Sequence, residues 1–589
     1  MKVMLVFPPP WTPAMPHLAL PVLASFLRSH GVQVIQRDLN LETYDAVLSR
    51  AYLEQVADRL SQVAQAREMP ESVRWALTQG PGLAARVEAA KAVYRGPDFY
   101  DGAKSLQAFE IIVQSLELAS LPFHPARLDL LNHVPASPVD SSRSLLQAVR
   151  DSRHNLFLDL FRHIILPDIQ RERPDIVGIS IPTMGQMLAA MTLAYLIKQA
   201  GLLCHVTLGG PHISMLRDQL PHAPALFGLI DSAVMFDGET PLLRLAEAID
   251  GGGDLVQVPN LIYRAGGEIQ ANPTGIRKNP IKPQAWHKTA RKAPPPDFDG
   301  LPLDRYLAPD LVLPLITAHG CYHGQCAFCN VGYGAGRGFY PLPVEQVLEH
   351  ITSLREKHGA RHIFFADEAI PPRTLRALST ELARQGAPVD WCGCARFDRA
   401  LSQELLESMA GGGYRMALFG LETASERVIQ HMIKGTQRET MGRVLEESAR
   451  AGIWNHTFFF FGFPTETMDD AQETINFIYA HQTAIHSASP GVFILERYSP
   501  VHLNPEKFGV RHIVQRPDQD LAIYFDYHVE SGLDDEMAET IVERLLDVWP
   551  SKRYGQYYVH DVYRFLYASH LHAQGQPFPP WLMEEGGTS

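Results

Sequence analysis

The stretch VLPLITAHGCYHGQCAFCN, residues 312–330, joins a short apolar run to a loop that contains three cysteines. The apolar run has the length and composition of a buried β-strand. Cys321, Cys326 and Cys329 follow it within nine residues, in a glycine-containing loop. Three thiolates so close in sequence can bind three corners of an iron–sulfur cube. The stretch therefore predicts a strand that ends at a metal-binding loop.

Zinc is the alternative metal for this loop. A structural zinc ion takes four ligands, so His319 or His323 would have to complete the set of three thiolates. The wider cysteine distribution favours reduced thiols over a disulfide framework, because only six cysteines occur in 589 residues and five of them lie between positions 321 and 394. The distribution predicts a cytoplasmic protein with a local metal site.

Strand-like segments recur beyond the cysteine loop, with helical patterns between most of them. Residues 344–358 show such a pattern, because their apolar side chains recur on one helical face. The six segments with strand character, the first of which leads into the loop, are 312–320, 360–368, 388–396, 414–422, 456–464 and 491–499. Six strands with helical crossovers predict a partial β/α barrel, smaller than the eightfold type.

The N-terminal part of the chain has a second α/β pattern. A helix is predicted at 18–30, between the first two of five apolar strand segments at 2–8, 32–38, 174–182, 205–210 and 229–236. Alternating strands and helices of this kind predict a doubly wound parallel sheet, which binds ligands at the carboxyl ends of its strands.

Composition along the chain predicts the domain boundaries. Residues 1–271 form the first α/β domain, and its strand pattern is interrupted by a helical insertion at about 41–168. A proline-rich linker follows at 272–310, then the barrel at 311–510. Residues 511–589 are rich in helix-forming and aromatic residues, which predicts a helical C-terminal domain.

Charge and hydropathy exclude two classes of partner. The net charge is −13 and no cluster of lysine and arginine occurs, so no nucleic-acid partner is expected. No apolar run approaches the roughly 18 residues that span a membrane. The first residues, MKVMLVFPPP, are expected to form a strand and not a signal peptide, because prolines interrupt the apolar run.

In its motifs the chain resembles the radical S-adenosylmethionine (SAM) superfamily, and specifically the members with an N-terminal cobalamin-binding domain. FGLETAS at 419–425, HMIKGT at 431–436 and FFFFGFPTET at 458–467 match the family's fourth-strand and fifth-strand segments in order. The usual cysteine spacing in the family is Cys-x3-Cys-x2-Cys, whereas this chain has one residue more in the first gap. The resemblance implies a [4Fe–4S] cluster on the three cysteines, with the fourth iron left for SAM.

The same resemblance implies a set of SAM contacts. Phe328, just before the third cysteine, would abut the adenine, and acids at the end of the second strand would bind the ammonium group. The implied residues are Phe328, Asp367, Glu368, Arg396, Glu422, Phe461 and Gly462. Solvated loop acids and plain packing at strand ends are the alternative interpretation of these residues, and no catalytic acid or base stands out.

The N-terminal domain resembles the cobalamin-binding domain of the same enzymes. GISIPTMGQ at 178–186, LGGPH at 208–212 and FDGET at 236–240 carry this resemblance. The implied cobalamin contacts are Ser180, Thr183, Gln186, Gly209, Gly210 and Glu239. The Asp-x-His-x-x-Gly motif that supplies a lower-face histidine to cobalt is missing, so a cofactor without that ligand, or a domain that has lost cobalamin, is implied.

Cys392 and Cys394 alternate along a predicted strand, so both side chains point to one face. Inert buried cysteines are the default interpretation. A thiol that takes part in radical chemistry is the alternative.

Three functional hypotheses follow from these observations. The first is cobalamin-dependent radical methylation of an unactivated carbon in a small-molecule or peptide substrate. The second is a radical cyclisation or rearrangement in which cobalamin transfers no methyl group or is absent. The third is a zinc-stabilised regulatory protein without turnover. Both enzyme hypotheses require a low-potential electron donor such as flavodoxin or ferredoxin.

Overall fold

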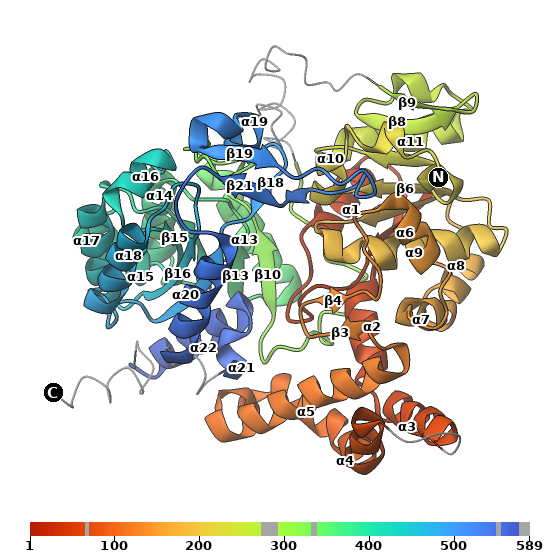
Figure 1. Cartoon of the computed structure of the whole chain (residues 1–589), viewed down its shortest axis with the longest axis horizontal. Helices are drawn as coiled ribbons and strands as arrows, with labels where there is room; N and C mark the ends of the chain where they lie inside the picture. Colours follow the sequence, from red (N-terminus) through yellow and green to blue (C-terminus); the bar gives the residue numbers. More distant parts are fainter. Residues whose placement is uncertain (65–69, 273–292, 332–337, 549–554, 577–589) are drawn as a thin grey trace. The chain divides into compact units, whose positions relative to one another are not determined.

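The computed structural model describes residues 1–64, 70–272, 293–331, 338–548 and 555–576 (Figure 1). These residues form two compact units, and each is built around its own parallel sheet. Unit 1 contains the described residues of 1–272 together with 293–309 and 516–523. Unit 2 contains the described residues of 310–515 and 524–576.

Unit 1 contains a seven-stranded sheet in the order β2-β1-β5-β6-β7-β8-β9. The first five strands in this order are parallel, which confirms the predicted parallel sheet. The last two form an antiparallel hairpin that the sequence patterns did not predict. The strands are β1 (Lys2–Phe7), β2 (Gln33–Asp38), β5 (Ile176–Ser180), β6 (His205–Gly209), β7 (Ser232–Val234), β8 (Leu261–Ala265) and β9 (Glu268–Ala271).

Strand β1 lies between β2 and β5, so the order of the strands reverses beside it. A parallel sheet with such a reversal opens a crevice at the carboxyl ends of the strands, where ligands bind. The hydrophobic core includes Val3, Leu5 and Phe7 of β1, packed with apolar residues of two helices. The helices of this α/β part are α1 (Ala19–Ser29), α9 (Met187–Gln199), α10 (Pro211–Met215) and α11 (Glu239–Asp250).

The chain between β2 and β5 is mainly helical. Its helices are α2 (Leu39–Val47), α3 (Arg50–Ala64), α4 (Glu71–Tyr94), α5 (Gly102–Ser120), α6 (Ser142–Ala148), α7 (Leu156–Ile164) and α8 (Leu166–Glu172). A short antiparallel hairpin, β3 (Arg127–Leu128) and β4 (His133–Val134), interrupts them. The predicted helical insertion therefore corresponds to a run of seven helices with one hairpin among the described residues.

Two segments that lie far along the sequence pack on unit 1. Residues 293–309 belong to the predicted linker, yet the Tyr306 hydroxyl donates to Asp38 Oδ2 over 2.6 Å in the buried interior. Residues 516–523 belong to the predicted C-terminal domain, yet the Leu521 amide donates to the Asp140 carbonyl over 2.8 Å. The rest of the predicted linker, residues 273–292, lies outside the described residues.

Unit 2 contains a six-stranded sheet in the order β10-β13-β14-β15-β16-β17. All neighbours are parallel, and β10 does not pair with β17, so the predicted partial β/α barrel is confirmed. The sixth strand begins earlier than the predicted 491–499. The strands are β10 (Val312–Leu315), β13 (His362–Phe365), β14 (Asp390–Ala395), β15 (Tyr414–Glu422), β16 (Trp454–Phe461) and β17 (Ser487–Val492).

Helices connect the barrel strands, and Figure 1 shows α15, α17 and α18 along the outer side of β15 and β16. The connecting helices are α13 (Val344–His358), α14 (Pro372–Arg384), α15 (Gln403–Gly411), α16 (Glu426–His431), α17 (Arg438–Arg450) and α18 (Met468–Ala480). The C-terminal part begins with short strands before its helices. Its elements are β19 (Val510–Ile513), β20 (Tyr524–Phe525), β21 (Tyr527–Val529), α20 (Asp535–Val548), α21 (Gly555–Tyr558) and α22 (Asp561–Ala573).

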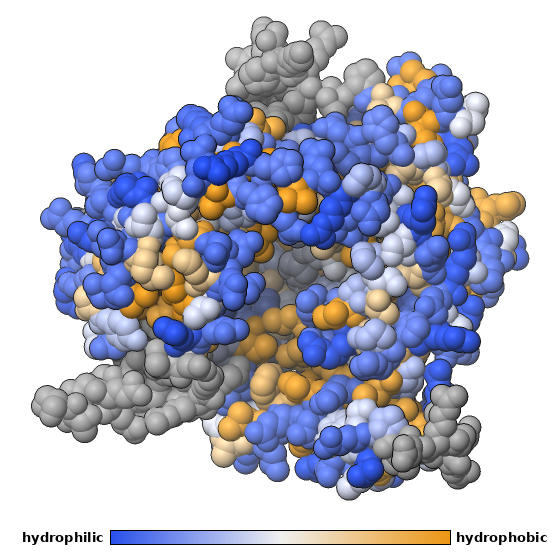
Figure 2. Space-filling view, in the orientation of Figure 1, coloured by the Kyte–Doolittle hydropathy of each residue, from blue (hydrophilic) through white to orange (hydrophobic). Residues whose placement is uncertain are grey.

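On the face drawn in Figure 2, hydrophilic residues cover most of the surface and hydrophobic residues occur in small groups. Among the described residues, no helix is both long enough and apolar enough to cross a lipid bilayer.

Gly210, directly after β6, gives a test of this fold. Its φ is +104°, and a Cβ there would lie 2.7 Å from the Ile181 carbonyl oxygen and 2.8 Å from the Ile181 nitrogen. Gly210→Ala should therefore lower the free energy of unfolding of unit 1 by at least about 2 kcal/mol. Gly201→Ala is the matched control, because Gly201 also has a positive φ but nothing lies within 4 Å of its added Cβ. Equal losses in both variants, measured by denaturant unfolding, would contradict the close backbone packing.

Candidate functional site

The three-cysteine loop follows β10 at the carboxyl end of the barrel sheet. Gly320 begins the loop with φ +76°, and an added Cβ there would lie 2.8 Å from the Gly338 carbonyl oxygen, so only glycine fits. The Cys326 side chain is buried, Cys321 and Cys329 are half-buried, and all three are free thiols.

The loop is fixed to residues 431–436, a segment that begins at the last residue of α16. The Ala327 amide donates to the Met432 carbonyl over 2.8 Å. His323 Nε2 bonds the Ile433 carbonyl over 2.7 Å, and Gly435 fits beside the His323 ring because an added Cβ would lie 2.6 Å from it. The proposed fourth zinc ligand at His323 thus has one ring nitrogen already engaged by the protein backbone.

The cysteine loop packs on an apolar cluster. It contains Ala327 with Met432, Phe463 and Phe493, and Phe328 packs against it. The Phe328 ring lies 5.3 Å from the ring of Phe460 at an edge-to-face angle. The loop therefore sits on a hydrophobic base, so its position does not depend on a bound metal alone.

The donor set fits an iron–sulfur cube. Among the described residues no three His, Cys, Asp or Glu side chains are gathered so as to hold a single metal ion. A cube has a different requirement, because each thiolate binds a separate iron and the three need only surround the cluster. Burial raises the pKa of the Cys329 thiol to about 12, so a thiolate at this position needs a cationic partner.

Arg396, directly after β14, supplies positive charge beside the loop. Its Nη1 lies 3.7 Å from Cys326 Sγ, and its Nη2 donates to the Lys434 carbonyl. The guanidinium also lies over the Tyr322 ring, 5.9 Å from the centroid. The resemblance assigned Arg396 to the SAM carboxylate. The structure places it against the cysteine loop, where hydrogen bonding to a cluster sulfur tunes the reduction potential.

Glu422 ends β15 in a left-handed conformation, with φ +61°, next to a register shift in the pairing with β16. Its Oε1 accepts from Lys434 Nζ over 2.6 Å, with both side chains largely buried at 12% and 7% exposure. Lys434 Nζ also lies 5.5 Å from the centre of the Phe328 ring. Gly420 leaves the necessary space, because an added Cβ would lie 2.4 Å from Glu422 Oε1. Sequence reasoning missed Lys434, although it quoted the motif HMIKGT that contains it.

The two acids after β13 differ in their surroundings. Asp367 is buried, and both its oxygens accept from Thr317: the amide at 3.0 and 2.9 Å and the hydroxyl at 2.7 Å. Burial raises the pKa of Asp367 to about 6. Glu368 is accessible to solvent, yet the enclosing protein raises the pKa of its carboxyl. Of the pair, Glu368 is the acid whose side chain is accessible to a ligand.

The backbone at the end of β16 is already engaged. The Gly462 amide donates to Glu466 Oε2 over 2.6 Å, and the Gly462 carbonyl accepts from the Tyr527 hydroxyl over 3.2 Å. The Phe461 carbonyl accepts from the Phe493 amide over 2.8 Å. Any adenine contact at Phe461 and Gly462 would therefore be apolar or go to the second lone pair of a carbonyl. The residue of β16 that contacts the cysteine loop is Phe460.

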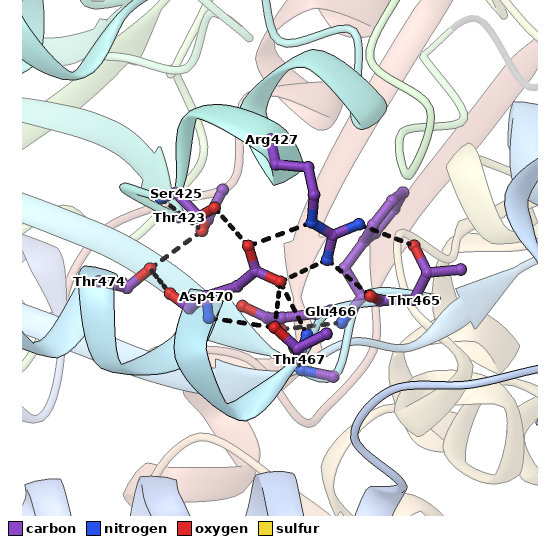
Figure 3. A network of polar contacts seen from close by, with 10 residues as sticks. Thr423, Ser425, Arg427, Thr465, Glu466, Thr467, Asp470 and Thr474 are labelled. Atoms are coloured by element: carbon purple, nitrogen blue, oxygen red, sulfur yellow. Dashed lines mark hydrogen bonds and ion pairs between the residues drawn. The ribbon is translucent and has the colours of Figure 1, made fainter.

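A polar network fixes the loops that follow β15 and β16 (Figure 3). Asp470 in the first turn of α18 accepts from the Ser425 hydroxyl over 2.6 Å and from Arg427 Nε over 3.2 Å. Arg427 in turn donates to the Thr465 carbonyl over 2.6 Å. Although burial opposes it, hydrogen bonds from Arg427, Ser425 and Thr467 hold the pKa of Asp470 well below its usual range. Asp470 thus stays ionised and ties the fourth-strand loop to the fifth.

Glu466 is the buried acid of this network. Its side chain has no exposed surface, its Oε2 accepts from the Gly462 and Phe463 amides, and its Oε1 has no hydrogen-bond partner among the described residues. Burial raises the pKa of Glu466 to about 7, against the opposing effect of the two amides. The acid therefore orders the turn after β16 and is partly protonated near neutral pH.

In unit 1, the predicted cobalamin residues gather at the carboxyl edge beside the point of strand reversal. Ser180 ends β5 and is buried, and Thr183 follows it. Gln186 Nε2 donates to the Pro8 carbonyl over 2.6 Å, so it joins the loops that follow β1 and β5. Its Oε1 accepts weakly from Thr183, with the amide at 3.3 Å. Gln186 is thus a buried residue that fixes the two loops at this edge, whereas Thr183 is exposed.

The two glycines at the end of β6, Gly209 and Gly210, are not equivalent. The close approach at Gly210 is to the Ile181 backbone, so this position must be glycine whether or not a ligand binds beside it. An added Cβ at Gly209 would find only the Val234 carbonyl, at 3.6 Å, so this position leaves more room for a ligand. Glu239 opens α11 beyond the end of β7, at the same edge of the sheet.

Two buried polar atoms near this edge fit a ligand with many hydrogen-bonding groups, such as cobalamin. Trp11 follows β1 and His212 follows β6, and neither Trp11 Nε1 nor His212 Nδ1 has a hydrogen-bond partner among the described residues. Unpaired buried polar atoms are uncommon in folded proteins and call for a water, an ion or a ligand. The edge thus offers unused hydrogen-bonding capacity where the sheet topology predicts a ligand.

The barrel and its cysteine loop define the class of protein. Residues 315–478 match the family model described as the radical SAM superfamily. The chain therefore carries a radical SAM domain, and this match spans the cysteine loop and the strands β13 to β16.

Two curated proteins to which the chain is similar are named as methyltransferases. An uncharacterised methyltransferase, PH0819, of Pyrococcus horikoshii is 27% identical over 313 residues, which cover 52% of this chain and 65% of the relative. The cytidylyl-2-hydroxyethylphosphonate methyltransferase of Streptomyces wedmorensis is 23% identical over 54% of this chain and 64% of the relative. The chain thus spans slightly less than two thirds of the length of these curated relatives.

A solved structure is similar over nearly the whole chain. The radical SAM methyltransferase TsrM from Kitasatospora setae, with tryptophan substrate and a SAM analogue bound, matches with a TM-score of 0.58 at 15% identity, over 99% of this chain and 98% of that one. The cobalamin-dependent SAM radical enzyme OxsB matches with a TM-score of 0.52 at 15% identity, over 74% and 73%. At these identities the likeness shows a shared fold.

Glu466 generates a prediction about pH. Because its folded pKa is raised from 4.5 to about 7, the stability that its protonated form contributes is complete below 4.5 and is lost as the pH rises towards 7. Glu466→Gln keeps an acceptor for the two amides but cannot ionise, so it should remove a pH-dependent loss of about 3 kcal/mol from the unfolding of unit 2. Urea unfolding at a series of pH values checks this, with the exposed Glu473→Gln as the control. An unchanged pH slope in Glu466→Gln would show that the acid is already ionised.

Proposed function

We propose that the chain is a radical SAM methyltransferase that holds a [4Fe–4S] cluster on Cys321, Cys326 and Cys329. The observation that carries the proposal is the cysteine loop itself, which is fixed to residues 431–436 at the carboxyl end of a six-stranded partial barrel. When bound, the cluster supplies the electron that breaks a C–S bond of SAM and releases the 5′-deoxyadenosyl radical. We infer that the chain acts in the cytoplasm with flavodoxin or ferredoxin as electron donor.

The chain's own residues would hold and orient SAM. Phe328 provides an apolar ring beside Phe460 for the adenine, and Glu368 offers an accessible carboxylate for the ammonium. Asp367 is buried next to Glu368 and supports the site indirectly, because it accepts a hydrogen bond from Thr317. Glu422 reaches SAM only together with Lys434, because the two share a short ion pair. A buried pair of this kind is sensitive to loss of either partner, since removal leaves an uncompensated charge.

Cobalamin is the second proposed cofactor. Ser180, Thr183, Gln186, Gly209, Gly210 and Glu239 are its proposed contacts and frame the carboxyl edge of the unit 1 sheet. The unpaired Trp11 Nε1 lies on the loop after β1, and His212 Nδ1 lies in α10, which follows β6 at this edge. When bound, cobalamin carries the methyl group between SAM and the substrate. Methylation of an unactivated carbon in a small molecule or peptide agrees with the methyltransferases among the relatives.

A radical cyclisation or rearrangement is the second candidate. It is favoured by the likeness to OxsB, whose description as a cobalamin-dependent SAM radical enzyme specifies no methyl transfer. Methyl transfer consumes one SAM as methyl donor and a second as radical source, so the two candidates differ in their by-products.

The by-products therefore test the proposal. Reconstituted protein with hydroxocobalamin, SAM and a low-potential reductant should form S-adenosylhomocysteine in proportion to bound cobalamin, together with 5′-deoxyadenosine, because both uses of SAM are built into one chain. Cys326→Ala should abolish 5′-deoxyadenosine by removing a cluster ligand. Chromatography of the two nucleosides measures this. Formation of 5′-deoxyadenosine without S-adenosylhomocysteine would favour rearrangement, and absence of both would refute the enzyme assignment.

A further inference from the structure

The inner face of the barrel sheet can be identified from two contacts with the cysteine loop. Phe460 of β16 packs on Phe328, and Arg396 after β14 reaches Cys326. Side chains alternate along a strand, so every second residue before these two faces the same way. Cys394 on β14 and His456 on β16 therefore face the barrel interior.

The upper part of this inner face is open and the lower part is closed. On β14 and β16, inward-facing residues near the carboxyl ends, such as Cys394, Phe458 and Phe460, are partly accessible, whereas His456 below them is fully buried. Helix α22 closes the lower part. Its Ser569 hydroxyl lies 3.0 Å from His362 Nε2 on β13, and its Asp561 carboxylate lies 3.9 Å from His456 Nε2.

The hydrogen bonds around His456 fix its tautomer. Ser487 Oγ accepts from Trp454 Nε1 over 2.8 Å and lies 2.8 Å from His456 Nδ1. Because Ser487 is fully buried, its own hydroxyl hydrogen needs an acceptor, and His456 Nδ1 is the one within reach. Burial lowers the pKa of His456 to about 3, so the ring is neutral and carries its single hydrogen on Nε2.

The charge of Asp561 supports the same tautomer. Although burial opposes it, Arg564 lowers the pKa of Asp561 to about 2, so a negative charge lies on the Nε2 side of the ring. Ser489 Oγ lies 3.2 Å from His456 Nε2 and therefore accepts its hydrogen. Ser489 on β17 is partly accessible and has no other hydrogen-bond partner among the described residues. Because Ser489 accepts from His456, its own hydroxyl hydrogen remains available to donate to another group.

We propose that Ser489 is a substrate-contacting residue that donates a hydrogen bond to a carbonyl or carboxylate oxygen of the substrate inside the barrel. His456 and Asp561 are positioning residues that hold the Ser489 oxygen as an acceptor, so that its hydrogen faces the ligand. The proposal rests on the proposed radical SAM function. It also gives helix α22 a role, because the helix supplies the charge that orients the group.

The position of Ser489 can be tested in reconstituted protein with SAM and a low-potential reductant, without a substrate. Ser489→Cys places an exchangeable S–D bond on the inner wall in D2O. If the wall lines the radical chamber, the 5′-deoxyadenosyl radical takes this deuterium, so that the S–D bond breaks, a C5′–D bond forms and a thiyl radical remains. The Cys394→Ala background removes the partly accessible native thiol from the same face, while Cys392, which also faces this way, is fully buried. Mass spectrometry should show a severalfold rise in monodeuterated 5′-deoxyadenosine.

Thr457→Cys is the matched control. Thr457 lies between His456 and Phe458 on β16, the strand that pairs with β17, and its side chain faces the opposite side of the sheet. It should give no rise. If Ser489→Cys gives no more label than this control while 5′-deoxyadenosine still forms, the proposal for Ser489 is overturned but the radical function stands. No 5′-deoxyadenosine in the background protein would instead overturn the function on which the proposal rests.

The direction of the hydrogen bond is tested by nitrogen NMR of the holoprotein labelled with 15N-histidine. The His456 signals are assigned by their loss in His456→Gln. Nε2 should be protonated and Nδ1 unprotonated, and Asp561→Asn should weaken this preference. A hydrogen on Nδ1 would leave Nε2 as an acceptor, so that Ser489 would donate its hydroxyl hydrogen to the ring. This result would overturn the proposal that Ser489 donates to the substrate.

Discussion

The docking of the cysteine loop on residues 431–436 is the constraint on which the site depends. The Met432 and Ile433 carbonyls hold the loop backbone and the His323 ring, and Lys434 carries a charge from this segment to Glu422. Arg396 then connects the Lys434 carbonyl to Cys326. The positive charges of Lys434 and Arg396 beside the cysteine loop are thus positioned by a segment about a hundred residues further along the chain, and the loop cannot shift without breaking several of these contacts.

Contacts between distant segments also fix the turns that follow β15 and β16. Asp470 and Arg427 tie these turns together, and Glu466 orders the backbone at Gly462. Tyr527, from the C-terminal part of the chain, holds the other side of Gly462. The radical SAM barrel is therefore completed by residues outside its six strands, with α22 below and the 524–535 region beside the fifth strand.

Sequence patterns predicted the two parallel sheets and the cysteine loop, because apolar periodicity and cysteine spacing are local signals. They did not predict the β8–β9 hairpin, the buried Glu422–Lys434 pair or the packing of residues 516–523 on unit 1. These features depend on which distant segments meet, and no local pattern records that. Gly210 shows the difference: its motif predicts a ligand contact, and the structure adds a close approach to the Ile181 backbone that no local pattern records.

Metal analysis of the protein as reconstituted without oxygen tests the central claim most directly. The account predicts about four irons and four acid-labile sulfides per chain, because three thiolates surround one cube. Cys321→Ala, Cys326→Ala and Cys329→Ala should each lose the cluster, whereas Cys204→Ala, in unit 1, should retain it. Stoichiometric zinc without labile sulfide in the native chain would contradict the account.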